Sequence, residues 1–181
     1  MKTLLFLILA CTASFAQEFK AIPTGLVSEK DPAINYVVAN FDNIPADTLY
    51  ANAKRYILSR YTGIKNPIVL DEKASLLRFE TVDEVMAAVD KKNQKVKYLG
   101  TATATLEFKD GKVKISYSGV AVSSLTGETR KELPLDSFWN AKRKLVDSEA
   151  KNSTETHFNA STRLLIDAMG KSNVKTASSE W

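Results

Sequence analysis

The chain has 181 residues, a formal net charge of +4 and one cysteine, Cys11. This length suffices for one domain with its own hydrophobic core. The mild positive excess lacks the concentrated basic footprint of a nucleic-acid binder, so no nucleic-acid partner is expected.

The N-terminal residues predict a secretory signal peptide over residues 1–16. Lys2 precedes the apolar run Leu4–Ala10, and the small residues Ser14 and Ala16 stand where signal peptidase requires them. Cleavage is therefore expected before Gln17. The run is shorter than the roughly 20 residues that span a bilayer, so no transmembrane segment is expected after signal removal.

These features predict an extracytoplasmic protein, either periplasmic or secreted. The segment after residue 16 contains no cysteine, which excludes a disulfide, a thiol nucleophile or a cysteine-ligated metal there. The lack of disulfides favours a Gram-negative envelope. One alternative stays open, because Ile8–Cys11 loosely resembles a bacterial lipobox and would place a lipid on Cys11.

The first third of the chain predicts two strands and a helix. Residues 17–32 form an irregular leading segment with a short strand near Phe19–Ile22, and the β-branched run Ile34–Phe41 predicts a central strand. A helix is expected from Pro45 to Tyr61, ended by Gly63. Its apolar face carries residues at helical spacing, namely Leu49, Tyr50, Ala53, Ile57 and Tyr61.

The middle of the chain predicts a short hairpin followed by a short helix. Strands are expected at Ile68–Leu70 and Leu76–Phe79. Thr81 and Glu84 have capping-box spacing, so a helix is expected over Thr81–Lys91. Continuation of the preceding strand through Val85 is the competing interpretation.

A long hairpin follows. Thr101–Phe108 alternates between apolar and polar residues, and Asp110-Gly111 is a favoured two-residue hairpin turn. The apolar phase continues through Tyr117 and slips at Ser118-Gly119, which predicts a bulge or bend.

The C-terminal part predicts two helices, the first over Asp136–Ser148. A break at Asn152–Thr154 precedes a second helix that runs to Met169 and ends at Gly170. The sequence thus predicts one domain over residues 17–170 and a flexible tail over 171–181. The expected class is α+β, with an antiparallel sheet, helices mainly on one face and two C-terminal helices.

Three segments resemble a family of secreted bacterial domains of unknown function with a fold like that of the TATA-box-binding protein. They are the strand Tyr36–Phe41, the helix entry Ile44–Tyr50 and the hairpin Leu106–Ser116 with its Lys109-Asp110-Gly111-Lys112 turn. The resemblance covers roughly residues 34–122. It implies the fold and secretion; it implies no catalytic residue and no DNA binding.

No residue pattern predicts a catalytic, cofactor or metal site. His157 is the only histidine and lies among polar residues, which predicts a surface position. Paired carboxylates are the remaining route to acid–base chemistry. The candidates for that role also fit turns and helix starts, and they are Asp71, Glu72, Glu80, Asp83 and Glu84.

One region carries a local excess of lysine and forms a possible anion-binding patch. Its members are Lys91, Lys92, Lys95, Lys97, Lys109, Lys112 and Lys114. The alternative is that these lysines only solvate strands and protect sheet edges.

The sequence favours a non-enzymatic binding module whose partner is an unknown protein or envelope component. Its binding surface would be the uncovered face of the sheet or the lysine-rich hairpin end. A carboxylate-based hydrolase and a structural accessory protein of an envelope complex are the alternatives.

Overall fold

The computed structural model describes residues 18–82, 84–91 and 94–171. The predicted signal peptide, Cys11, Asp83, Lys92 and residues 172–181 of the predicted tail lie outside the described residues. In chain order the elements are β1 (Phe19–Ile22), β2 (Gly25–Ser28), β3 (Tyr36–Asn40), α1 (Ala46–Arg60), β4 (Ile68–Glu72), β5 (Leu76–Glu80), β6 (Glu84–Lys91), β7 (Gln94–Lys109), β8 (Lys112–Thr126), β9 (Thr129–Glu132), the 3₁₀ helix η1 (Leu135–Phe138) and α2 (Ser148–Gly170).

Two long central strands organise an antiparallel sheet. The order along the main path is β3-β8-β7-β5-β4, with β6 added to β7 and β9 added to β8. Because β7 and β8 are 16 and 15 residues long, each has different neighbours along its length. The strands β1 and β2 form a separate hairpin.

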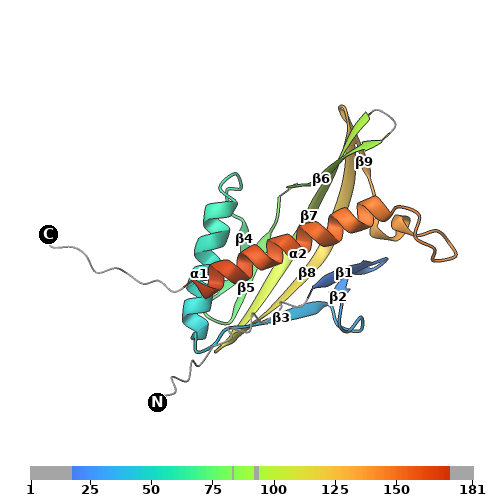
Figure 1. Cartoon of the computed structure of the whole chain (residues 1–181). Coiled ribbons are helices and arrows are strands. Elements are labelled where there is room, and N and C mark those ends of the chain that lie inside the picture. Colours follow the sequence, from blue (N-terminus) through green and yellow to red (C-terminus); the bar gives the residue numbers. More distant parts are fainter. Residues whose placement is uncertain (1–17, 83, 92–93, 172–181) are drawn as a thin grey trace, which may run out of the picture.

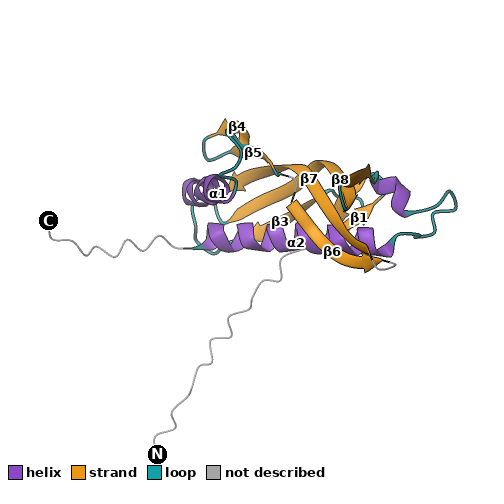
Figure 2. Cartoon of the chain, turned by 90° about the horizontal axis from the view of Figure 1, so that it is seen from above, coloured by secondary structure: helices purple, strands orange, loops and turns teal. Residues whose placement is uncertain are grey.

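Both α-helices lie on the same face of the sheet, as Figures 1 and 2 show. On β7 the side chains that face them are buried and alternate with polar ones, so Ala102, Ala104 and Leu106 point inward between threonines. Residues of both helices join the same core, including Ile57 and Leu165. The predicted α+β class with helices on one face is confirmed. None of the described helices is long and apolar enough to cross a membrane.

The predicted helix after Pro45 and the predicted central hairpin are also confirmed. Asp110-Gly111 connects β7 and β8, and Gly111 has the positive φ of 72° that such a turn needs. The phase slip predicted at Ser118-Gly119 is a β-bulge. Thr101 pairs with Ala121 whereas Thr103 pairs with Ser118, and Gly119 has a φ of 59°.

The helix predicted over Thr81–Lys91 is wrong, because Glu84–Lys91 is the strand β6. It pairs with β7 from Glu84 opposite Gly100 to Lys91 opposite Gln94. The β-branched residues of this segment fit both a helix and a strand. The strand β7 begins well before the predicted hairpin strand, and this added N-terminal length pairs with the segment and so selects the strand. The competing interpretation of a continuing strand was closer.

The two predicted C-terminal helices are wrong in number and position. The segment predicted as the first holds only the short η1 and a loop, and α2 is a single 23-residue helix that runs through the predicted break. The Asp147 side chain accepts a hydrogen bond from Ala150 N at 3.0 Å and caps α2. Within the helix, Thr154 Oγ1 donates to the carbonyl of Ala150 at 2.8 Å, so the polar residue is accommodated.

Candidate functional site

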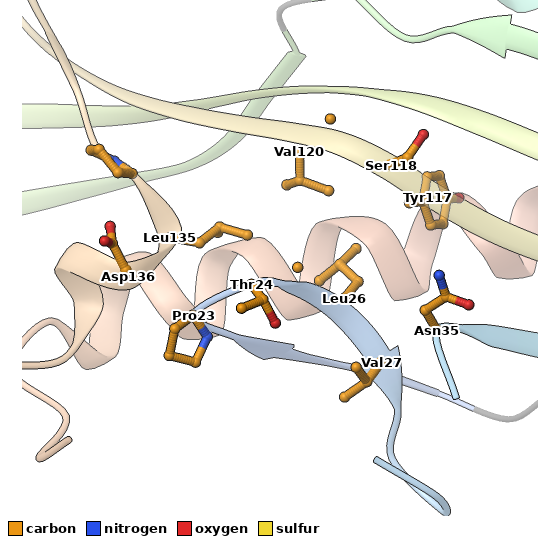
Figure 3. A pocket seen from close by; sticks show the side chains of 13 residues that line it. Pro23, Thr24, Leu26, Val27, Asn35, Tyr117, Ser118, Val120, Leu135 and Asp136 are labelled. Carbon is orange, nitrogen blue, oxygen red and sulfur yellow. The ribbon is translucent and has the colours of Figure 1, made fainter. Parts of the chain in front are cut away.

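A pocket of about 580 Å³ lies where the β1–β2 hairpin, the bulge of β8 and η1 meet (Figure 3). Its residues come from four short stretches of the chain, namely Pro23–Val27, Asn35, Tyr117–Val120 and Pro134–Asp136. The sequence does not predict this site, because its patterns favour a mostly irregular segment over residues 17–32 and a helix over residues 136–148. The bulge signal at Ser118-Gly119 was the one indication of it, because bulges often lie beside functional sites.

The pocket faces a stretch of β8 that has no strand partner on one side. The strand β3 pairs with β8 as far as Ser116, and β9 begins to pair at Ser123. Between Ser116 and Ser123, β7 is the one described strand that pairs with β8, and it lies on the other side of β8. Asn35 and Pro134 line the pocket next to the ends of the two interrupted neighbours, so the pocket occupies the gap in the sheet edge.

The middle of the pocket is mainly apolar, with Thr24 among the apolar side chains, and a polar side chain lies at each end. In Figure 3, Leu26 and Val120 extend toward each other from β2 and β8, and Leu135 lies beside them on the side of Asp136. Asn35 and Asp136 lie at opposite ends of the same view. The arrangement fits a ligand with an apolar centre and polar groups at both ends.

A buried aromatic cluster supports this wall of the pocket. The Tyr117 ring packs edge-on against Phe19 and Phe158, with centroids 5.2 and 4.9 Å away. Its hydroxyl shares a 3.0 Å hydrogen bond with Thr162 Oγ1 of α2. Burial raises the pKa of Tyr117 far above its usual value, so this phenol stays neutral and acts as a fixed structural group.

A second hollow of about 570 Å³ continues from the first, sharing Pro23, Thr24 and Asp136 with it. Trp139 and Arg143 belong to its other wall. A ligand longer than the first pocket could therefore extend along the hairpin tip toward an aromatic ring.

The predicted lysine patch is divided between the two ends of β7. Lys95 and Lys97 lie near its start and Lys109 at its end, roughly 40 Å apart at the usual rise per strand residue. At the far end Lys109 and Lys112 are direct partners across the turn. Anion binding by this patch stays a prediction that now concerns two separate groups.

Several of the lysines have partners. Lys114 Nζ donates to Glu107 Oε1 at 2.8 Å and lies 4.6 Å from the centroid of the Tyr36 ring. Lys95 faces Asp90 across the β6–β7 pair. Lys91 lies in β6, and Lys92 is outside the described residues.

The uncovered face of the sheet is polar along β7. Thr101, Thr103 and Thr105 alternate with the buried alanines and point away from the helices. The most exposed large apolar side chain on this face is that of Val85 in β6, which is 55% exposed. Along β7 this face therefore presents a row of hydroxyl groups.

The four candidate carboxylates that the structure describes are not gathered in one place, and none of them lines any of the three hollows. Asp71 accepts hydrogen bonds from Lys54 Nζ at 2.6 Å and from the Tyr50 hydroxyl. Both bonds, with Lys54 the stronger cause, lower the pKa of Asp71, so it is held as a carboxylate. Glu72 lies beside Ser75, and Glu80 is exposed at the end of β5.

The fourth of these carboxylates, Glu84, lies in a half-buried charge cluster that joins three elements. Arg60 of α1 donates to both oxygens of its carboxylate at 3.1 Å, and His157 Nε2 of α2 lies 3.5 Å from Glu84 Oε2. The surface position predicted for His157 is wrong, since its side chain is only 13% exposed. Burial lowers the pKa of His157, although the Glu84 charge opposes the effect.

A third hollow of about 470 Å³ is lined by several carboxylates, each of which already has a basic partner. Glu18 pairs with Arg163, Glu29 with Lys20 at 3.8 Å and Glu155 with Lys151 at 2.6 Å. Glu155 Oε1 also accepts the Ala21 N–H at 2.8 Å and so joins α2 to β1. These acids connect elements of the fold. Among the described residues, no group of three histidine, cysteine or acidic side chains is arranged to hold a metal ion.

No family model and no curated protein sequence matches this chain. Two solved structures share its fold. A DUF4468 family protein from Bacteroides ovatus has a TM-score of 0.52 and 17% identity, over 78% of this chain and 90% of its own. A TBP-like protein from Parabacteroides distasonis has a TM-score of 0.52 and 13% identity, over 76% and 92%. The predicted resemblance to a domain of unknown function with a TBP-like fold is thus confirmed, and identities this low establish the fold alone.

Proposed function

We propose that this chain is a non-enzymatic, extracytoplasmic binding module that holds an extended segment of a partner protein along the open edge of β8. The observation that carries the proposal is the gap between β3 and β9, where the edge of β8 faces a preformed pocket. An exposed strand edge presents unpaired backbone groups to any chain that can reach it. Strand addition of this kind is a recurring mode of peptide recognition.

The size of the gap suits a short strand. The Leu133 N–H already donates to the Val122 carbonyl at 2.8 Å, so the open stretch of β8 is Tyr117–Ala121, which is roughly 15 Å long and suits about four or five residues of an added segment. Main-chain hydrogen bonds to β8 would supply affinity, and the pocket would supply specificity. The floor of Leu26, Val120 and Leu135 favours an apolar side chain at the centre of the segment, and Asp136 favours a basic or hydroxyl group near one end.

The alternative of a carboxylate-based hydrolase receives less support. That chemistry needs two acids separated by about 5–9.5 Å in one cleft. Asp136 is the one carboxylate of the main pocket, and the acids of the third hollow are paired with bases. The extracytoplasmic location rests on the Lys2 to Ala16 signal pattern of the sequence.

Binding of an acetylated and amidated random hexapeptide library to the full chain tests the proposal. We expect recovery of peptides with an apolar central residue, and we expect Val120→Trp to abolish their capture by filling the pocket. Val85→Trp is the matched control, because Val85 is exposed on β6 and lines none of the three hollows.

The same experiment separates the competing functions. Peptides recovered intact after long incubation support a binding module, whereas cleaved peptides support a hydrolase. Equal capture by both tryptophan variants would exclude the pocket as the binding site.

A further inference from the structure

The loop between η1 and α2 is a preorganised turn with a strongly basic tip. At its base Trp139 and Leu145 form an isolated antiparallel bridge. Asn140 N donates to the carbonyl of Lys144 at 2.9 Å, and the Asn140 side-chain oxygen accepts the N–H groups of Lys142 and Lys144 at 2.9 and 3.0 Å. These bonds fix the loop, so its tip is presented without further ordering.

Three consecutive cations occupy this tip. Lys142, Arg143 and Lys144 are all exposed, and no carboxylate of residues 18–82, 84–91 or 94–171 lies within ion-pair distance of them. The sequence does not distinguish these three residues, because its pattern predicts that they lie within a helix. In a helix, three consecutive side chains would point in different directions around the helix axis, whereas in this loop they are gathered at one tip.

Two exposed apolar side chains directly follow the cations. Leu145 is 37% exposed and Val146 is 59% exposed. Figures 1 and 2 both show this loop projecting beyond the N-terminal end of α2, away from the sheet. A narrow projection thus carries positive charge and adjacent apolar surface.

We propose that residues 140–146, the basic loop, dock the protein on an anionic membrane surface. The loop would lie with its side against the surface, so that the cations of the tip contact lipid phosphates and the exposed Leu145 and Val146 at its base reach the headgroup boundary. A membrane fits this shape better than an acidic protein does. A specific protein interface needs about 800 Å² from each partner, whereas a lipid surface can be engaged by a loop tip alone. The inference goes beyond the proposed peptide site, because the main pocket contains no residue of this loop; Asn140 and Arg143 line only the adjoining second hollow.

The test is sedimentation of the full chain with phosphatidylcholine vesicles that contain or lack phosphatidylglycerol, at low and high salt. The charge-neutral variant combines Lys142→Gln, Arg143→Asn and Lys144→Gln. Asparagine is chosen for Arg143 because that residue has a φ of 58°. Each cation near an anionic surface strengthens binding by about fivefold, so the variant should bind phosphatidylglycerol vesicles about a hundredfold more weakly.

The control variant removes the same charge elsewhere, through Lys30→Gln, Lys65→Gln and Lys73→Gln, three exposed lysines outside the loop and outside the predicted lysine patch. It should bind within about threefold of the native protein, because its charges lie outside the loop and are screened over about 10 Å. An unchanged melting temperature in each variant shows that the fold is retained.

A third variant, with Leu145→Ser and Val146→Ser, separates membrane insertion from charge attraction. It should weaken binding roughly tenfold at both salt concentrations, since salt does not screen apolar burial. Three results would overturn the proposal: native protein that ignores anionic vesicles, equal binding to both lipids, or equal loss in the loop and control charge variants. Binding that is unaffected by the serine variant would refute the insertion step.

Discussion

Replacing Gly119 with alanine should destabilise the protein by about 1 to 2 kcal/mol. Gly119 lies in the β8 bulge with a φ of 59°, a left-handed conformation that an L side chain rarely adopts. A Cβ placed there would meet no heavy atom within 4 Å. The cost therefore comes from the backbone alone, and it measures how strongly the fold imposes the bulge that shapes the pocket.

Gly63 is the matched control for this substitution. It also has open space around an added Cβ, but its φ is not in the left-handed region. Alanine at Gly63 should be neutral or stabilise the protein by up to about 1 kcal/mol, through reduced freedom of the unfolded chain. Urea unfolding followed by circular dichroism gives both free energies, and melting temperatures should differ by about 2 to 4 °C for each kcal/mol.

Equal urea midpoints for the two alanine variants would contradict this account. If Gly119→Ala and Gly63→Ala unfold at the same urea concentration, the bulge conformation is not imposed by the fold. The geometry assigned to the pocket wall would then be wrong. The free energy of unfolding of Gly119→Asn should lie between those of the native protein and Gly119→Ala, because asparagine tolerates the left-handed region better than alanine does.

Two further predictions follow from the structure and one from the sequence. The lowered pKa of His157 means that the unfolded state binds more protons, so the free energy of unfolding should fall as pH drops through about 6.5. Urea titrations at several pH values should show a steeper dependence of this free energy on pH for the native protein than for His157→Asn. Parallel pH dependences would contradict the burial argument. Asp110 accepts the Ala46 N–H at 2.8 Å at the start of α1, so Asp110→Ala should cost about 1 kcal/mol in unfolding free energy, and no loss would refute the cap. N-terminal sequencing of exported protein should begin at Gln17, whereas an acyl mass on Cys11 would establish the lipid anchor instead.

The central hairpin and α1 could be predicted because their signals are local. Asp110-Gly111 specifies the turn, strict alternation specifies the strand, and the helical spacing from Leu49 to Ile57 specifies the buried face. The bulge was also visible, since Gly119 stands where the apolar phase changes. In each case the deciding residues are close together in the sequence.

The strand β6 and the C-terminal segment could not be predicted because distant residues decide them. Val85 and Val89 fit a helix or a strand, and only the extended β7 provides the partner that selects the strand. In the C-terminal segment the bridge between Trp139 and Leu145 and the bonds of Asn140 stabilise a turn where helix periodicity was expected.

The candidate site could not be predicted from local sequence patterns, because it too depends on residues that are distant in the sequence. Its pocket exists because β3 begins at Tyr36, opposite Ser116, and β9 ends at Glu132, opposite Ser123, and both limits depend on register in the folded sheet. Asn35 and Asp136 are ordinary polar residues in the sequence. Only the fold brings them to the two ends of one hollow.

The measurement that tests the central claim most directly is an amide chemical-shift map of the isotope-labelled protein with the captured hexapeptides. Strand addition predicts the largest shifts at Ser118–Ala121 of β8, with slowed hydrogen exchange of those amides and no response in Val120→Trp. Shifts confined to the threonine-rich sheet face, or to the lysines at either end of β7, would contradict binding at the open edge.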